Sequence, residues 1–148
     1  MMYIREVEIH YRDTDIAVDH AKLNVPEHVV AYMKGAIEFR IDQEQLWVIL
    51  LDARLQAMGR FLCHLGTASA CLIHPREVFR PAIVGSACNI IVVHNHPSGD
   101  PSPSDADKVL TKRLKSCGEL LNIQLLDHVI LGRAEVDPEG QGYYSFME

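Results

Sequence analysis

The sequence predicts a single α/β domain built on a mixed β-sheet with flanking helices. Short apolar runs of strand length, at 46–51 and 90–93, alternate along the chain with longer segments that repeat apolar residues every three or four positions. The length of 148 residues suits one domain. Because 48% of the residues are hydrophobic and 23% are charged, the chain can bury a core, and this composition excludes a disordered protein.

The first 38 residues are predicted to hold an N-terminal segment and one helix. Residues 1–24 are polar and mixed, and we expect an extension or, where 3–11 alternate weakly, an edge strand. Asn24 precedes a proline and a glutamate, a pattern typical of a helix start, so a helix is predicted over 25–38. Its apolar residues recur four apart, at Val29, Met33 and Ile37.

Three strands and a helix should follow. The strands are expected over 45–52, 56–64 and 69–74, because these segments are rich in branched, aromatic and other apolar residues and Gly66 separates the last two. Pro75 begins a helix to about residue 84, which Pro81 should kink because proline lacks an N–H and clashes with the preceding turn.

The second half of the chain continues the alternation. The fully apolar strand 90–93 is typical of a sheet that is covered on both faces. A rigid loop over 95–103 with three prolines leads to a helix from Ser104 to about residue 121. Its predicted apolar stripe is Leu110, Leu114, Cys117 and Leu121. Two more strands are expected over 124–131 and 142–147.

Charge and composition restrict the partners and the location. The net charge of −6 disfavours a general nucleic-acid binder, so we expect DNA binding to be weak. A basic stripe on the 104–121 helix, formed by Lys108, Lys112 and Lys115, is most simply a solvated face. No apolar run approaches the roughly 18–20 residues that span a bilayer, so no membrane partner is expected.

We expect a cytoplasmic protein. Residues 1–10 carry charges where a signal peptide would have its apolar region. The four cysteines (Cys63, Cys71, Cys88 and Cys117) form no CxxC pair. We therefore expect reduced, mostly buried thiols, and neither a disulfide framework nor a cysteine-type zinc site.

The segment from His94 to Asp107 carries the predicted site. His94 and His96 are two apart at the end of an apolar strand, so their side chains share one face and can chelate one ion. Asp107, one turn into the next helix, can add an oxygen ligand. Two nitrogens and one carboxylate leave a fourth position open on a tetrahedral zinc ion, which is the pattern of catalytic sites.

Each part of this pattern also has a purely structural interpretation. A lone His-x-His on a strand is more often packing plus a hydrogen bond than a pair of metal ligands. Ser104 with Asp107 also fits a capping box, with serine at the N-cap and an acidic residue three positions later. The cap and the metal site are compatible, because the cap can order the loop while the carboxylate binds the ion.

The combined spacing resembles a known family. His-x-His, seven residues and Ser-x-x-Asp form the zinc signature of the JAMM (JAB/MPN-type) metalloproteases, and the run from His94 to Ser104 resembles their bacterial RadC branch. The motifs His74–Val78, Leu125–His128 and Tyr144–Phe146 also match. The resemblance covers about 25–148 and implies the JAB/MPN fold, a cytidine-deaminase-like mixed sheet with flanking helices in one domain.

The family signature includes a glutamate just before a core strand. Glu44 holds that place in this sequence, immediately before the predicted strand 45–52. Glu38 is the rival, although it falls within or at the end of the preceding helix. An ordinary solvated loop carboxylate is the structural alternative for Glu44. We favour Glu44.

The resemblance implies a zinc-dependent hydrolase that cleaves a peptide or isopeptide amide. Zinc (Zn²⁺) on His94, His96 and Asp107 would lower the pKa of a water molecule. Glu44 would act as general base, and Ser104 would help to stabilise the oxyanion. The implied partner is a protein or peptide substrate, with a ubiquitin-like conjugate as one candidate. Asn95 should face away and serve a structural role, and His128 is a structural or outer-sphere group.

Other classes fit less well. A zinc deaminase requires HxE and PCxxC, which this sequence lacks. HNH nucleases distribute their residues over a hairpin and a helix rather than a tripeptide. A DNA-repair accessory module, in keeping with the RadC name, and a catalytically silent scaffold remain alternatives. The helix-hairpin-helix region of longer family members does not occur in these residues, which weakens the expectation of DNA contacts, and the intact motif favours an enzyme.

Overall fold

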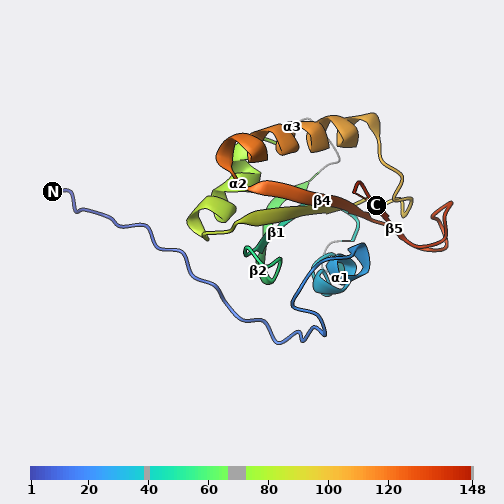
Figure 1. Ribbon diagram of the computed structural model, residues 1–148, viewed down its shortest axis with the longest axis horizontal. Helices are drawn as coiled ribbons and strands as arrows, with labels where there is room; N and C mark the ends of the chain where they lie inside the picture. Colours follow the sequence, from blue (N-terminus) through green and yellow to red (C-terminus); the bar gives the residue numbers. More distant parts are fainter. Residues whose placement is uncertain (39–40, 67–72, 148) are drawn as a thin grey trace.

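The computed structural model describes residues 1–38, 41–66 and 73–147 and shows a five-stranded mixed sheet with helices on both faces (Figure 1). The sheet order is β2-β1-β3-β4-β5; β3 and β4 are parallel and the other neighbours are antiparallel. This confirms the predicted fold class. The elements are α1 (Pro26–Tyr32), β1 (Glu44–Leu51), β2 (Ala57–Gly66), α2 (Pro75–Val84), β3 (Asn89–Asn95), α3 (Asp105–Leu121), β4 (Gln124–Leu131) and β5 (Tyr143–Ser145).

The central strand β3 supplies apolar side chains to both faces of the sheet. Ile90 and Val92 pack with α2 and α3 in one core, whereas Ile91 and Val93 pack with α1 in the other. Figure 1 shows α2 and α3 on one side of the sheet and α1 on the opposite side. The continuous apolar run of β3 is therefore explained by burial on both faces, as the sequence predicted.

Helix α3 is the crossover between the two parallel strands. Its N-terminus lies close to the carboxyl end of β3, and its C-terminus leads through Asn122 into β4. Asn122 adopts the left-handed conformation (φ 58°) that commonly ends a helix. This topology brings the end of β3, the loop after it and the first turn of α3 together at one edge of the sheet. Ligand sites of open α/β sheets occupy this kind of position.

The N-terminal predictions need correction. Residues 3–11 form no strand; this exposed segment leads away from the body as an extended trace (Figure 1). Helix α1 ends at Tyr32 rather than residue 38, because Gly35 adopts a positive φ of 79° that is incompatible with a continuing helix. Its N-cap is Val25, not Asn24, and Val25 makes no side-chain capping bond.

Smaller differences occur elsewhere. Helix α2 runs through Pro81 as predicted, and the kink expected there stays a prediction. Leu121 is 43% exposed at the end of α3, so the buried stripe stops earlier than predicted, and Cys88 is exposed. The strand predicted over 69–74 falls mainly on 67–72, outside the described residues. Within the described part of the chain, no helix has the length and apolar character needed to cross a membrane.

Candidate metal centre

Four metal-ligating side chains meet at this edge of the sheet. One possible ligand atom from each of Glu44, His94, His96 and Asp107 lies within 4.8 Å of all the others. His94 and Asp107 are buried, and Glu44 and His96 are partly exposed. The residues come from β1, β3, the loop that follows β3, and α3. Every site residue that the sequence identified as a ligand or as the base therefore lies in one cluster.

Strand periodicity places the histidines. His94 follows Ile90 and Val92 on the face of the sheet that packs against α3. His96 comes directly after β3, and its N–H donates to the Leu131 carbonyl at 3.0 Å, so it continues the direction of the strand. The ring Nε2 atoms of His94 and His96 are 3.1 Å apart.

Strand pairing places Glu44. Leu46 of β1 lies opposite His94 of β3, so Glu44, two residues earlier, shares the face of His94. Asn95 points to the other face, where its side chain accepts from the Gln45 N–H at 2.7 Å and donates to the Gln43 carbonyl at 3.1 Å. These two bonds hold the start of β1 against the end of β3. Asn95 thus has the structural role predicted for it.

The first turn of α3 places Asp107. The Ser104 hydroxyl accepts from the Asp107 N–H at 3.1 Å, and Asp107 Oδ2 accepts from the Ser104 N–H at 2.9 Å. This is the predicted capping box. In this bond the Ser104 hydroxyl is the acceptor, so its own hydrogen can still be donated to another group. The Ser104 residue is exposed. Cap and metal site are both compatible with this geometry.

The donor atoms lie close enough together to hold one metal ion. Asp107 Oδ1 lies 3.2 Å from His94 Nε2, and Asp107 Oδ2 lies 3.1 Å from His96 Nε2. Zinc bonds of about 2.0–2.1 Å at tetrahedral angles put neighbouring donors about 3.3 Å apart. Glu44 Oε1 is farther away, 3.7 Å from His94 Nε2. Asp107 approaches each imidazole with a different oxygen, and Glu44 lies somewhat farther from His94. Two imidazoles and two carboxylates could hold a metal ion, and zinc binds ligands of these types.

Asp107 and His96 each stabilise the charged form of the other. Burial raises the pKa of Asp107, but hydrogen bonds from His94 and His96 outweigh it and hold the pKa well below its ordinary value. Burial lowers the pKa of His96, but the hydrogen bonds to Asp107 and to the Asp100 carbonyl leave it raised. The raised pKa of His96 means that protons compete with a cation for its ring nitrogen.

Part of the surroundings of the two histidines could not be predicted from the sequence. His96 Nδ1 lies 2.8 Å from the Asp100 carbonyl, a usual outer partner of a metal-binding histidine. His94 Nδ1 instead lies 2.7 Å from Nε2 of His128, whose other nitrogen is 2.6 Å from the Thr111 hydroxyl. Burial lowers the pKa of His128 well below its ordinary value. The Leu125–His128 motif pointed to His128, but no sequence signal identified Thr111.

The loop after β3 is held from outside by Arg133. Gly99, in this loop, has a φ of 93°. A Cβ on Gly99 would lie 2.8 Å from the Arg133 guanidinium carbon. The guanidinium donates to the Ser98 carbonyl at 3.1 Å. Because Gly99 has no side chain, the Arg133 guanidinium can lie against the loop that carries His96 and hydrogen-bond to it.

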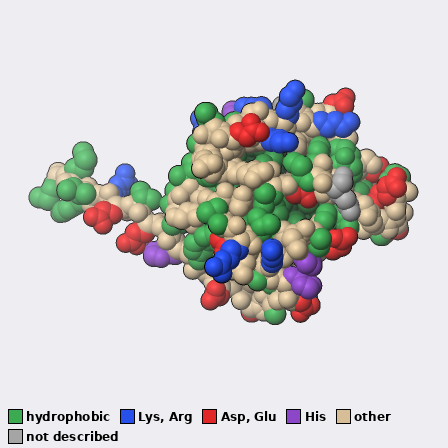
Figure 2. Space-filling model, viewed as in Figure 1, with side chains coloured by type: hydrophobic (Ala, Val, Ile, Leu, Met, Phe, Trp, Pro, Cys, Tyr) green, Lys and Arg blue, Asp and Glu red, His purple; other side chains and the backbone are tan. Residues whose placement is uncertain are grey.

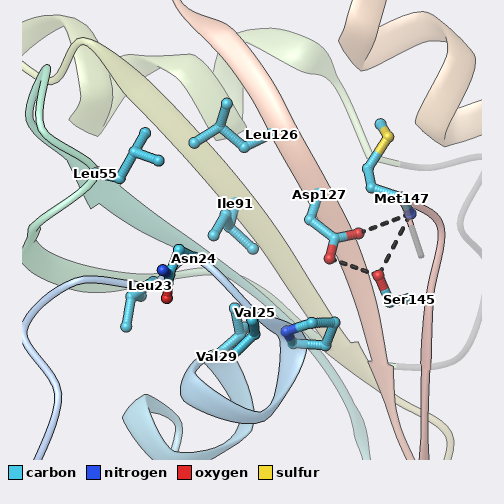
Figure 3. Close-up of a pocket in the computed structure, with 11 residues that line it drawn as sticks. Leu23, Asn24, Val25, Val29, Leu55, Ile91, Leu126, Asp127, Ser145 and Met147 are labelled. Carbon is cyan, nitrogen blue, oxygen red and sulfur yellow. Dashed lines mark hydrogen bonds between the residues drawn. The ribbon is translucent and has the colours of Figure 1, made fainter.

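A hollow of about 220 Å³ lies on the other face of the sheet, near α1 (Figure 3). Its main polar group, the Asp127 carboxylate, accepts from the Ser145 hydroxyl at 2.6 Å and from the N–H groups of His128 at 2.7 Å and Met147 at 3.2 Å. Asp127 thus anchors the C-terminal segment, which is a structural role. A second hollow, of about 230 Å³, adjoins His96 and is lined partly by apolar residues of α1 and the segment after it.

Comparisons with known proteins identify the family of this chain. The family model of the RadC-like JAB domain matches residues 23–148. The chain belongs to the RadC-like JAB domain family. It is 48% identical over 108 residues to a UPF0758 protein of Thermotoga maritima. The matched region is 73% of this chain and 46% of the relative. A UPF0758 protein of Chlorobaculum tepidum is 50% identical over 111 residues, 75% of this chain and 50% of the relative.

A third relative extends the match. The UPF0758 protein of Chlorobium chlorochromatii is 43% identical over 127 residues, 86% of this chain and 54% of that protein. The chain thus spans about half the length of these curated relatives. A RadC-like JAB domain with a Glu-His-His-Asp group that could hold a metal ion fits a JAMM-like domain.

Proposed function

We propose that the chain is a zinc-dependent metallopeptidase that hydrolyses a peptide or isopeptide amide. The observation that supports this most strongly is the cluster of two imidazoles and two carboxylates at the edge of the sheet. His94, His96 and Asp107 would hold the ion, because their donor atoms lie 3.1–3.2 Å apart. When bound, zinc lowers the pKa of water and polarises a carbonyl oxygen.

The residues around the ion would transfer the proton and stabilise the oxyanion. Glu44 lies at the partly exposed side of the cluster, where its carboxylate would take a proton from the attacking water and later give it to the leaving amine. The exposed Ser104 hydroxyl would donate its hydrogen to the developing oxyanion. His96 and Asp107 keep their orientation through Asp100 and the capping box.

The substrate class is a protein or peptide, with a ubiquitin-like conjugate as one candidate. The hollow that adjoins His96 is lined by no other residue of the metal cluster, and we propose that it takes a part of the substrate away from the scissile bond. We also propose that the reaction takes place in the cytoplasm, because the cysteines in the described part of the chain (Cys63, Cys88 and Cys117) are free thiols.

One equivalent of zinc per chain is the expected result of elemental analysis on protein purified without a chelator. The double variant His94→Ala/His96→Ala should lose it, because two of three close donors disappear. Zinc affinity should fall as the pH is lowered through the raised pKa of His96, since a proton then competes with the ion. Full zinc retention by the double variant would rule out this site.

The alternative function, a DNA-repair accessory or scaffold module, has one local feature in its favour. Lys108, Lys112 and Lys115 are exposed on α3. Figure 2 shows basic and acidic side chains interspersed along the side of the molecule where α3 lies. With a net charge of −6, such a surface is a weak match for a phosphate backbone.

Duplex DNA should therefore bind weakly at physiological salt, with a Kd on the order of 10⁻⁴ M or weaker. Fluorescence anisotropy over a salt series measures this directly. The triple change of Lys108, Lys112 and Lys115 to Glu should make little difference to so weak an interaction. A salt-resistant submicromolar complex that the triple change abolishes would favour the DNA-repair function instead.

A further inference from the structure

A chain of buried hydrogen bonds runs behind His94. His94 Nδ1 lies 2.7 Å from His128 Nε2, and His128 Nδ1 lies 2.6 Å from the Thr111 hydroxyl oxygen. That hydroxyl lies 2.8 Å from the backbone carbonyl of Asp107. None of these four residues is more than 8% exposed. The chain thus starts at one candidate metal ligand and ends at the backbone of another.

Counting hydrogens leaves two arrangements for this chain. A neutral imidazole has one donor and one acceptor nitrogen, and a threonine hydroxyl has one hydrogen. If the Thr111 hydroxyl donates to the Asp107 carbonyl, its oxygen accepts from His128 Nδ1–H, and His128 Nε2 accepts from His94 Nδ1–H. The Nε2 atom of His94 then has a free lone pair, which a metal ion requires.

The reversed arrangement holds the same number of protons. Here the Thr111 hydroxyl donates to His128 Nδ1, and His128 Nε2–H donates to His94 Nδ1. His94 then carries its hydrogen on Nε2, directed at Asp107 Oδ1 3.2 Å away, and this nitrogen cannot bind a metal ion. The Asp107 backbone carbonyl favours the first arrangement and the Asp107 carboxylate favours the second.

We propose that Thr111 and His128 are positioning residues that present the unprotonated Nε2 of His94 to the metal ion. The inference rests on the proposed metal site. His96 needs no such device, because its Nδ1 lies 2.8 Å from the Asp100 carbonyl, which is only an acceptor. With an ion bound next to Asp107, the Thr111 hydroxyl would favour the metal-ready tautomer of His94 from a position that does not touch the ion.

Thr111→Val and Thr111→Ser form the matched pair of variants. Valine has the shape of threonine but no hydroxyl, so the metal-ready arrangement would leave a buried His128 N–H without an acceptor. Serine keeps the hydroxyl. Competition with a chromophoric chelator should show zinc affinity about 10–100-fold weaker in Thr111→Val, the usual effect of losing an outer partner, and near wild type in Thr111→Ser.

A second pair tests His128 itself and covers the case in which Thr111→Val fails to fold. The carbonyl oxygen of glutamine can accept from His94 Nδ1–H near the position of His128 Nε2, whereas leucine cannot accept at all. We therefore expect His128→Gln to retain more zinc affinity than His128→Leu. Equal affinities within this pair would contradict the proposal.

Nitrogen-15 NMR of the histidine side chains reads the tautomers directly. In zinc-loaded wild type, His128 and His94 should both carry their hydrogen on Nδ1. A His128 hydrogen on Nε2 in the loaded protein, or equal zinc affinity of Thr111→Val and Thr111→Ser, would overturn the positioning role alone. A wild-type chain that binds no zinc would overturn this inference together with the proposed function.

Discussion

Glu44→Gln should keep zinc bound and lower amide hydrolysis by about 10²–10⁴-fold, the usual contribution of general acid–base catalysis. Glutamine has nearly the same shape but cannot take a proton from water. The carboxylate is the most distant donor of the cluster, 3.7 Å from His94 Nε2, against 3.1–3.2 Å among the other three. Loss of its charge should therefore affect proton transfer much more than metal binding.

The experiment needs an active substrate, so a panel of isopeptide and C-terminal peptide amides is screened first with zinc-loaded wild type. The variant is then compared by kcat/KM and by bound zinc. Glu119→Gln, the same chemical change near the far end of α3, is the matched control and should behave like wild type. Ser104→Ala should cost less activity than Glu44→Gln if the ion carries most of the oxyanion charge.

Equal rates for Glu44→Gln and wild type would refute the base assignment. Glu38 is the other glutamate that the sequence offered, so Glu38→Gln is measured in parallel. Glu38 is exposed and is not part of the metal-ligating group in the described chain. A rate that falls only in Glu38→Gln would transfer the role of base to that residue.

Elements with both a strong apolar pattern and a clear end signal could be predicted closely from the sequence. The predicted strand 124–131 matches β4, and the helix predicted from Ser104 to residue 121 matches α3 with Ser104 as its N-cap. The wrong predictions concern segments whose apolar pattern is not supported by the neighbouring structure. Residues 3–11 alternate but have no neighbouring strand to pair with, and Gly35 ends α1 early in spite of the apolar spacing.

The site residues likewise separate into those predictable from local sequence and those that depend on long-range contacts. His94, His96 and Asp107 could be predicted because they are close in sequence and lie on a strand end and a helix start. Choosing Glu44 over Glu38 on physical grounds requires the pairing of β1 with β3, which is a long-range fact. Thr111 could not be found, because a threonine one turn beyond Asp107 looks like any buried helix residue until His128 is brought next to it by β4.

Asp107→Asn should weaken zinc binding by more than the roughly 10–100-fold that losing an outer partner costs. The carboxylate lies between His94 and His96, with one oxygen near each ring. The hydrogen bonds from these rings hold the pKa of Asp107 well below its ordinary value, so an anion occupies this position at neutral pH. Asparagine removes that charge from a largely buried site, where it attracts a divalent cation most strongly.

The fold should survive this change, and this separates the two roles of Asp107. Its Oδ2 atom also accepts from the Ser104 N–H at 2.9 Å, and the amide oxygen of asparagine can accept the same bond. Ser104→Ala does the reverse, because it removes the capping hydroxyl and leaves the carboxylate. We expect Ser104→Ala to cost about 1 kcal/mol in the free energy of unfolding and to keep zinc.

Urea unfolding of the metal-free and zinc-loaded proteins measures both effects. An ion that binds only the folded chain stabilises it according to its affinity, so zinc should raise the unfolding midpoint of wild type and of Ser104→Ala but scarcely that of Asp107→Asn. A large zinc-induced shift in Asp107→Asn would remove Asp107 from the ligand set. The capping box would then be the main role of this residue, and the ion would depend on His94, His96 and Glu44.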